Sequence, residues 1–462
     1  MIPSPAPTTS ITEPPSTPAA GPIRTVLRLW LLLRRRDAGR SDPQRLTGVL
    51  AVFAFAVCTG VLLLVLGGFG AFQARAAAPA SSPDAGFYLL LAGIASGLLV
   101  VPLATLGGAA ARLAVARRDE RLAALRLAGA TAGQVAVLTV LEATLQALAG
   151  ALLGAAGVFA LIPLVLPVTF QGQPFTYTDL VAPWWVFALT VAGVTTVSLV
   201  SAAGSLAKVV LTPVGVAARH RPRPLHWTRV LPIAAIAVAF VVLIQTGRAG
   251  IVVLAVLVAA GLAMVNLLGP WVLGLLGRVV ATRARSAATL IAARRIIDDP
   301  KGAWRSVGAV ALCTFIAGLT AAIAITDPGE RPDGTVDPVF ADLSAGGMLT
   351  LVIAGATAAV STGVMQAGRI IDQRTQYRAL HAAGTELRVI HSARLRQTAI
   401  PLIGAVATAT AASMLFILPA LGFALLTAVP VLVQFGLSVI GVCALVLGGA
   451  LAARPVVRTV LA

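Results

Sequence analysis

Side chains that could do chemistry are few in this chain of 462 residues, and they are scattered. Neither lysine stands in the Gly-Lys-Ser/Thr context in which a P-loop cradles phosphate, because Lys208 follows an alanine and Lys301 a proline. The cysteines lie singly in apolar runs and the histidines in polar segments away from carboxylate clusters: Cys58, Cys313, Cys443, His220, His226, His381 and His391. We therefore expect no enzymatic activity, no metal site and no cofactor of the chain's own, and any ATP must be bound by a partner subunit.

One carboxylate, Glu142, falls inside a long apolar run. Ionisable residues at membrane depth are candidates for function. Glu142 stands early in its run, near the expected inner headgroups, which favours a structural or coupling role over proton or substrate handling. Three further polar residues at this depth, Gln146, Asn266 and Gln434, predict hydrogen bonds between helices.

The composition is that of a membrane protein. Hydrophobic residues make up 58% of the chain and charged residues 11%, whereas about 25% of the residues of a soluble domain are charged. The net charge of +18 comes from short basic clusters between apolar runs, a pattern typical of cytoplasmic loops. We therefore expect the lipid bilayer, and not a nucleic acid, as the surrounding partner.

The apolar runs predict an all-α, polytopic protein, since about 20 apolar residues form one spanning helix. Ten stretches qualify: 47–72, 86–111, 135–166, 183–208, 230–245, 251–277, 306–326, 346–367, 397–421 and 427–452.

The distribution of charge predicts a multi-pass protein of the cell membrane with both termini cytoplasmic. With the N-terminus inside, only Arg75, Arg248 and Arg331 of the 35 basic residues fall outside. Seven acidic residues are then expected in outer segments: Asp84, Asp179, Asp327, Glu330, Asp333, Asp337 and Asp342.

Three pairs of short motifs recur in the same order and indicate an internal repeat. They are a basic cluster followed by Asp-Pro (34–43 and 294–300), Ala-Leu-x-x-Ala-Gly (124–129 and 379–384), and Pro-Val (213–214 and 455–456). The predicted organisation is a disordered cytoplasmic tail (1–23), a four-helix unit (24–218), a two-helix linker region (219–286) and a second four-helix unit (287–462). Both units start inside, so the repeats are expected to be parallel, with a pseudo-two-fold axis along the membrane normal.

The segment after the second predicted helix is charged at first, then apolar at helical spacing, and ends at a glycine that can stop a helix. A single copy would fit an amphipathic helix resting on lipid headgroups, but a second copy after the eighth helix favours a soluble partner that docks at two equivalent places. The candidate residues are Arg117, Arg118, Glu120, Leu125, Ala128 and Gly129 in the first copy, and Arg374, Tyr377, Leu380 and Gly384 in the second.

The runs RRDERLAALRLAGATAGQVAVLTVLEATLQALAGALLG (117–154), AARRIIDDPKGAWRSVGAVAL (292–312) and TPVGVAAR (212–219) resemble the FtsX-like permeases of ABC transporters. This resemblance implies a permease subunit that works with a separate cytoplasmic ATPase, and it implies that 117–129 and 374–384 are coupling helices. The arrangement of four, two and four helices is similar to bacitracin-type peptide-resistance permeases, in which one permease meets two ATPase chains. Those relatives carry a large outer domain between helices seven and eight, whereas only residues 327–346 stand there in this chain.

The resulting hypothesis is an ABC transporter permease that couples ATP hydrolysis by two ATPase copies to movement, in the direction of export, of an amphipathic or lipid-like substrate. Two alternatives remain open. One is a membrane signalling module that works with an ATPase and a sensor kinase or a cell-wall enzyme. The other is an ion-coupled secondary transporter, for which Glu142 is the only candidate residue.

Overall fold

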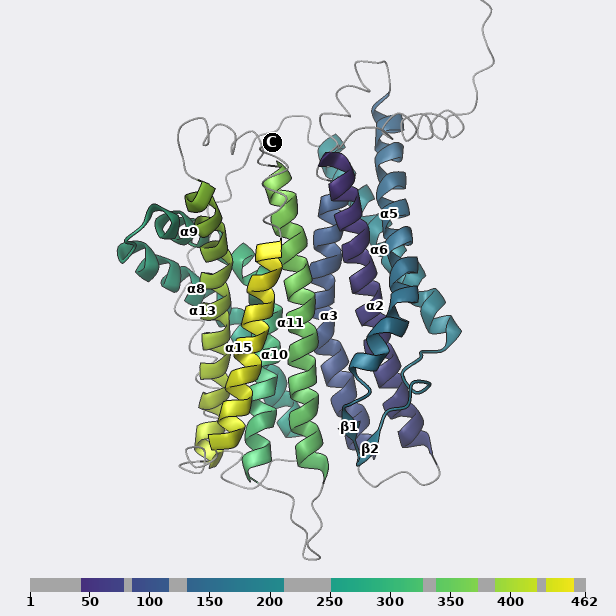
Figure 1. Ribbon diagram of the computed structural model, residues 1–462, viewed down its shortest axis with the longest axis vertical. Helices are drawn as coiled ribbons and strands as arrows, with labels where there is room; N and C mark the ends of the chain where they lie inside the picture. Colours follow the sequence, from purple (N-terminus) through teal and green to yellow (C-terminus); the bar gives the residue numbers. More distant parts are fainter. Residues whose placement is uncertain are drawn as a thin grey trace, which may run out of the picture.

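The computed structural model describes residues 43–78, 85–115, 131–211, 251–326, 338–372, 387–421 and 429–452. These residues form ten α-helices, a short 3₁₀ turn and one two-stranded hairpin (Figure 1). Nine of these helices are long and apolar enough to cross a membrane. The predicted all-α, polytopic class is therefore confirmed, while the predicted span at 230–245 lies outside the described residues.

The first half of the described chain contains α2 (Pro43–Ala77), α3 (Ala85–Val115), α5 (Ala132–Leu161) and α6 (Trp184–Leu211). Helix α2 packs against both α3 and α5, and α6 packs on α5. Small residues permit this contact, because a Cβ atom at Gly154 of α5 would overlap the carbonyl oxygen of Ala56 in α2. Glycine allows such close backbone approach between membrane helices.

The second half contains α8 (Ile251–Thr282), α9 (Ala287–Asp298), α10 (Pro300–Thr326), α11 (Pro338–Asp372), α13 (Leu387–Leu421) and α15 (Val429–Ala452). Helix α10 lies at its centre and packs on α8, α11 and α13. Helix α9 is short and was not predicted; it lies to one side of the bundle, beside α8 and α13 (Figure 1).

The Asp-Pro motifs mark the starts of two long helices, as the repeat predicts. Helix α2 begins at Pro43 and α10 at Pro300. Proline suits the first helical position because its missing N–H would have no partner there. The preceding Asp299 caps α10, since its Oδ1 accepts a hydrogen bond from the backbone N–H of Gly302 at 2.8 Å.

The sequence predicts a loop between residues 326 and 346, and this prediction is wrong from residue 338 onward. Helix α11 begins at Pro338, so Asp342 lies within a helix and is buried instead of standing in an outer segment. Hydropathy placed the start of the span at the first long apolar run, but a proline at the first helical position starts this helix earlier.

Helices α3 and α11 lie together at the centre of the contact between the two halves. On either side of them, α2 contacts α11 and α3 contacts α10. These reciprocal contacts are what two parallel units would make, but the last helices differ, because α6 packs on α5 whereas α15 packs mainly on α11. The pseudo-two-fold arrangement and the domain boundaries stay predictions.

Candidate functional site

A cavity lies between the two halves of the bundle, at the end where α2 and α10 finish and α3 and α11 begin. We call this end the cap end, after the loop at residues 162–183 between α5 and α6. It is the predicted outer side. We call this cavity the interface cavity. It has a volume of about 250 Å³ and is walled by α2, α3, α10, α11, Val258 of α8 and the loop between α5 and α6. Its lining is mostly apolar, with six aromatic side chains: Phe69, Phe72, Phe87, Tyr88, Phe170 and Phe175.

Asp342 of α11 lines this cavity with only 7% of its surface exposed. Its Oδ2 atom accepts a hydrogen bond from the Tyr88 hydroxyl at 2.6 Å and another from the backbone N–H of Gln171 at 2.6 Å. Both donors are neutral, so they satisfy hydrogen bonding at the oxygen without cancelling the charge of an ionised carboxylate. The three residues belong to α11, α3 and the α5–α6 loop, so this carboxylate links both halves of the bundle.

Gln171 reaches Asp342 because of a tight turn. Strands β1 (Thr169–Phe170) and β2 (Gln173–Pro174) pair in antiparallel fashion, and Gln171 and Gly172 form the turn between them. Both turn residues have positive φ, 58° and 70°, as in the type I′ turns that join two-residue hairpins. The turn directs the Gln171 N–H toward α11.

Arg75 anchors this loop, residues 162–183, which we call the cap. Its Nη1 donates to the Phe170 carbonyl at 2.9 Å, and its Nη2 donates to the Pro174 carbonyl at 3.1 Å. The guanidinium also lies 4.5 Å from the centroid of the Phe175 ring, a distance at which cation–π attraction is significant. Phe72 packs edge to face against Phe170 and Phe175 beneath it, with ring centroids 5.4 and 5.5 Å apart.

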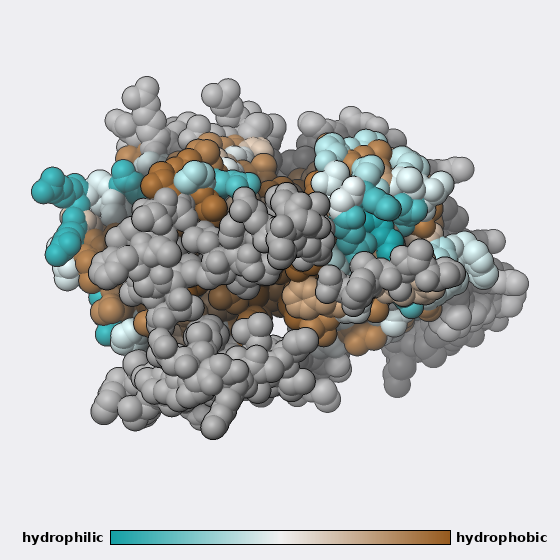
Figure 2. All heavy atoms as spheres, turned by 90° about the horizontal axis from the view of Figure 1, so that it is seen from below, coloured by the Kyte–Doolittle hydropathy of each residue, from teal (hydrophilic) through white to brown (hydrophobic). Residues whose placement is uncertain are grey.

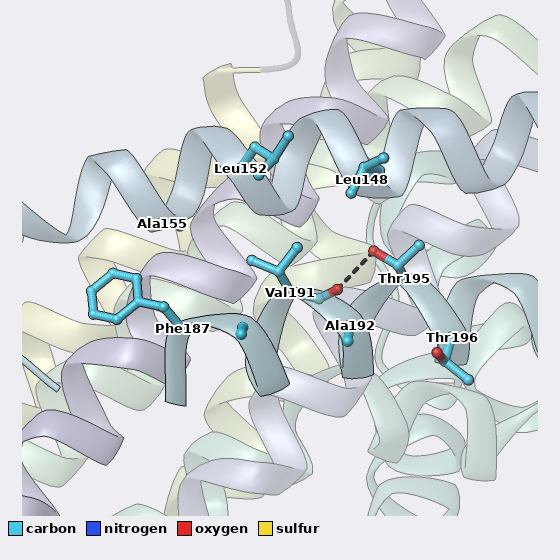
Figure 3. Close-up of a pocket in the computed structure, with 9 residues that line it drawn as sticks. Leu148, Leu152, Ala155, Phe187, Val191, Ala192, Thr195 and Thr196 are labelled. Atoms are coloured by element: carbon cyan, nitrogen blue, oxygen red, sulfur yellow. Dashed lines mark hydrogen bonds between the residues drawn. The ribbon is translucent and has the colours of Figure 1, made fainter. Parts of the chain in front are cut away.

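A second hollow lies between α5 and α6, on the face of the bundle away from the second half (Figure 3). It is shallow, with a volume of about 550 Å³, and its lining is almost wholly apolar: Leu148, Leu152, Ala155, Phe187, Ala188, Val191, Ala192, Thr195 and Thr196. The Thr195 hydroxyl donates to the Val191 carbonyl of its own helix at 2.7 Å. This surface suits lipid acyl chains, and it has few polar groups that could orient a ligand.

The residues predicted for ATPase coupling, from Arg117 to Gly129 and from Arg374 to Gly384, lie outside the described residues. The flanking helices are described: α3 ends at Val115 and α5 begins at Ala132, while α11 ends at Asp372 and α13 begins at Leu387. These four helix ends lie at the end of the bundle opposite the cap (Figure 1). We call it the coupling end.

Glu142 is half-buried in α5 and stands in the part of this helix nearer the coupling end, so it is not part of the interface cavity. Of the other polar residues, Asn266 does bond between helices, since its Oδ1 accepts from the Trp304 indole N–H at 2.9 Å. Gln146 differs: its buried Oε1 has no hydrogen-bond partner among the described residues. Gln434 is exposed on α15.

A polar cluster that the sequence analysis missed ties α11 to α13 beside the second predicted coupling segment. Arg394 Nη2 donates to the Gln366 carbonyl at 2.9 Å and to its Oε1 at 2.7 Å. The Gln366 amide in turn donates to Thr398 Oγ1 at 3.1 Å. Aligning the two Ala-Leu-x-x-Ala-Gly motifs puts Ala111 opposite Gln366 and Thr139 opposite Arg394. The first half therefore has different side chains at these places.

Asp342 and Tyr88 were also missed as site residues. The available signal was Pro338 followed four residues later by a carboxylate, a pattern that places the acid one turn inside a helix. No pattern in the sequence could have paired Asp342 with Tyr88, because 254 positions separate them.

Comparison with known proteins gives one family match. Residues 93–211 match the family described as FtsX-like permease C-terminal. The match covers most of α3, the first predicted coupling segment, α5, the cap and α6. No curated protein and no solved structure matches the chain. Together with the nine candidate spans in the described residues, the match identifies this chain as a multi-pass membrane protein whose residues 93–211 are similar to the FtsX-like permease C-terminal family.

Proposed function

We propose that the chain is the permease subunit of an ABC transporter, driven by a separate ATPase that binds the ATP. The observation that carries this proposal is the match of residues 93–211 to the FtsX-like permease family. The matched region includes the segment 117–129 together with the helices on both sides of it, α3 and α5. That segment is where the resemblance to ABC permeases implies the first ATPase contact.

In this proposal an ATPase dimer contacts two coupling segments, 117–129 and 374–384, and its closure moves them. The residues flanking both segments lie at the coupling end. In the second half, the Arg394–Gln366–Thr398 hydrogen bonds join α11 and α13 next to the segment, so the pair would move together. Helix α11 also contacts α2 and α3 of the first half and lines the interface cavity, which gives this movement a direct route to the cap end.

Export of an amphipathic or lipid-like molecule is the transport activity that this arrangement supports best. The cavity lies between the halves that would move relative to each other, its lining is mostly apolar, and a buried carboxylate supplies a polar contact. With both termini cytoplasmic, as the charge distribution predicts, the cavity stands on the outer side of the membrane. A substrate released from it would leave outward.

The proposal is tested by affinity purification of the detergent-solubilised full chain, with mass spectrometry of the proteins that accompany it. We expect an ABC ATPase at about two copies per permease, one for each repeat. Reversing charge at Arg117 and Arg118 together, to glutamate, should release most of this ATPase. The matched control reverses Arg294 and Arg295, an exposed pair on α9, and should retain it.

Retention of the ATPase by the Arg117/Arg118 double variant would contradict the coupling role of this segment. Absence of any ATPase would overturn the ABC assignment. Recovery of a sensor kinase with the ATPase, together with no substrate movement in vesicles, would replace transport by signalling.

A further inference from the structure

We propose that the interface cavity binds a hydrophobic organic cation, with the Asp342 carboxylate as its counter-ion. This inference names a substrate class for the proposed transporter and in that sense rests on the proposed function. The binding itself needs no ATPase, so it is measured separately from ATPase coupling.

The first support is the carboxyl group in the cavity. Asp342 is 7% exposed in a mostly apolar wall, and the hydrogen bonds that its Oδ2 accepts from the described residues come from two neutral donors, the Tyr88 hydroxyl and the Gln171 amide. Burying a charge is unfavourable unless an opposite charge accompanies it. Arg75 of α2, the basic residue that anchors the cap, donates to the Phe170 and Pro174 carbonyls. A cation that enters the cavity would supply the missing positive charge.

The second support is the aromatic lining. Six rings border the cavity, and ring faces attract cations, most strongly where water is excluded. One of these rings already shows the interaction, since the Arg75 guanidinium lies 4.5 Å from the centroid of Phe175. A cation with an apolar body would therefore contact rings and aliphatic side chains while its charge faces Asp342.

The third support is size. The cavity volume of about 250 Å³ is slightly below the range of about 300–1,000 Å³ found for drug-sized ligand sites. A compact aromatic ammonium ion fits this space, whereas a two-chain phospholipid does not. From the cap end, polar surface gathers over the half that carries the cap, beside apolar surface of the bundle (Figure 2). A cation could approach along this border before it passes under the cap.

The decisive substitution is Asp342→Asn. The amide oxygen of asparagine can still accept from Tyr88 and Gln171, so the link between the halves is kept while the charge is removed. The matched control is Asp298→Asn, which removes an equal charge from an exposed position on α9, outside the cavity.

The experiment uses the purified full chain in nanodiscs of phosphatidylcholine, with empty nanodiscs as background. The probe is radiolabelled benzyltrimethylammonium, measured by equilibrium dialysis, and the competitor is neopentylbenzene, in which a neutral carbon replaces the nitrogen. Unlabelled benzyltrimethylammonium should displace the probe, and neopentylbenzene should not. We expect Asp342→Asn to weaken cation binding about tenfold or more, the size of effect expected when a buried charge partner is lost, and Asp298→Asn to leave it unchanged.

Unchanged cation affinity in a folded Asp342→Asn protein would overturn the proposal, and equal loss in the Asp298→Asn control would overturn it too. If Asp342→Asn fails to fold, the wild-type chain decides: saturable binding that the neutral competitor cannot displace supports the site, and no saturable binding refutes it. Recovery of an ATPase with a chain that binds no cation would leave the proposed function standing without this substrate class.

Discussion

The contact between α2 and α5 gives a prediction that isolates close helix packing in this membrane protein. In Gly154→Ala, the new methyl group would overlap the carbonyl oxygen of Ala56 and lie 2.8 Å from the Cβ atom of Thr59. Three residues further along the same helix, a methyl group in Gly157→Ala would meet no atom within 4 Å. The two variants make the same chemical change on one helix and differ in the space around it.

The expected magnitude follows from two opposing contributions. Alanine is the better helix former by up to about 1 kcal/mol per residue, and both variants gain this equally. Overpacking of a close contact costs about 1–3 kcal/mol, and it applies at Gly154 alone because that methyl group meets backbone atoms that cannot rotate away. The free energy of unfolding of Gly154→Ala should therefore be lower than that of Gly157→Ala by about 1–3 kcal/mol.

The assay is unfolding of each purified variant by titration with sodium dodecyl sulfate in mixed micelles, followed by tryptophan fluorescence. Gly154→Ala should unfold at a lower dodecyl sulfate fraction than wild type, and Gly157→Ala at the wild-type fraction or above it. Identical transitions for both variants would refute the reasoning, since the backbone of α5 could not then lie directly on that of α2.

Three further predictions test contacts elsewhere in the bundle. On α15, Gly449→Ala would push a methyl group into the backbone of α11, whereas the neighbouring Gly448→Ala would meet nothing within 4 Å; thermal unfolding in detergent should show a lower Tm for the first variant only. Asp299→Ala removes the N-terminal capping hydrogen bond of α10 and should lower the free energy of unfolding by about 1 kcal/mol. Asp298 is exposed on α9, so Asp298→Ala should change this free energy little in the same titration. Arg75→Lys keeps the charge but lacks the planar guanidinium group that donates to two cap carbonyls. Amide hydrogen exchange in residues 168–176, monitored by mass spectrometry, should therefore become faster. Unchanged exchange would show that Arg75 does not hold the cap.

Much of the architecture was accessible from the sequence, because it depends on local properties. Spanning helices need long apolar runs, and nine of the ten predicted runs coincide with candidate spans in the described residues. The Asp-Pro pairs stand at the starts of α2 and α10, a few residues before the predicted spans at 47–72 and 306–326, because proline has a specific place at helix starts. The start of α11 was placed too late because hydropathy does not register the polar first turns of a helix.

The glycines that permit close packing could not be identified from the sequence. A Cβ atom at Gly67 would meet the carbonyl oxygen of Leu180 in the cap, so this glycine makes room for a loop. Close approaches between helices occur at Gly150 and Gly154 of α5 and between Gly363 and Gly449. Sequence alone could not distinguish these positions, because the spacing of glycines along one helix does not identify the surface that packs against it.

By itself, the sequence determined the membrane class and the helical fold, because these follow from apolar length and the placement of charge, while the coupling segments stay predictions. Only the tertiary structure decided which carboxyl group is buried at the interface cavity. Asp342 contacts Tyr88 and Gln171 from 254 and 171 positions away, and the Arg394–Gln366 hydrogen bonds join two helices at one end of the bundle. Such contacts depend on how helices pack side by side. Packing brings together side chains that are far apart in the sequence, and no local pattern predicts which of them will meet.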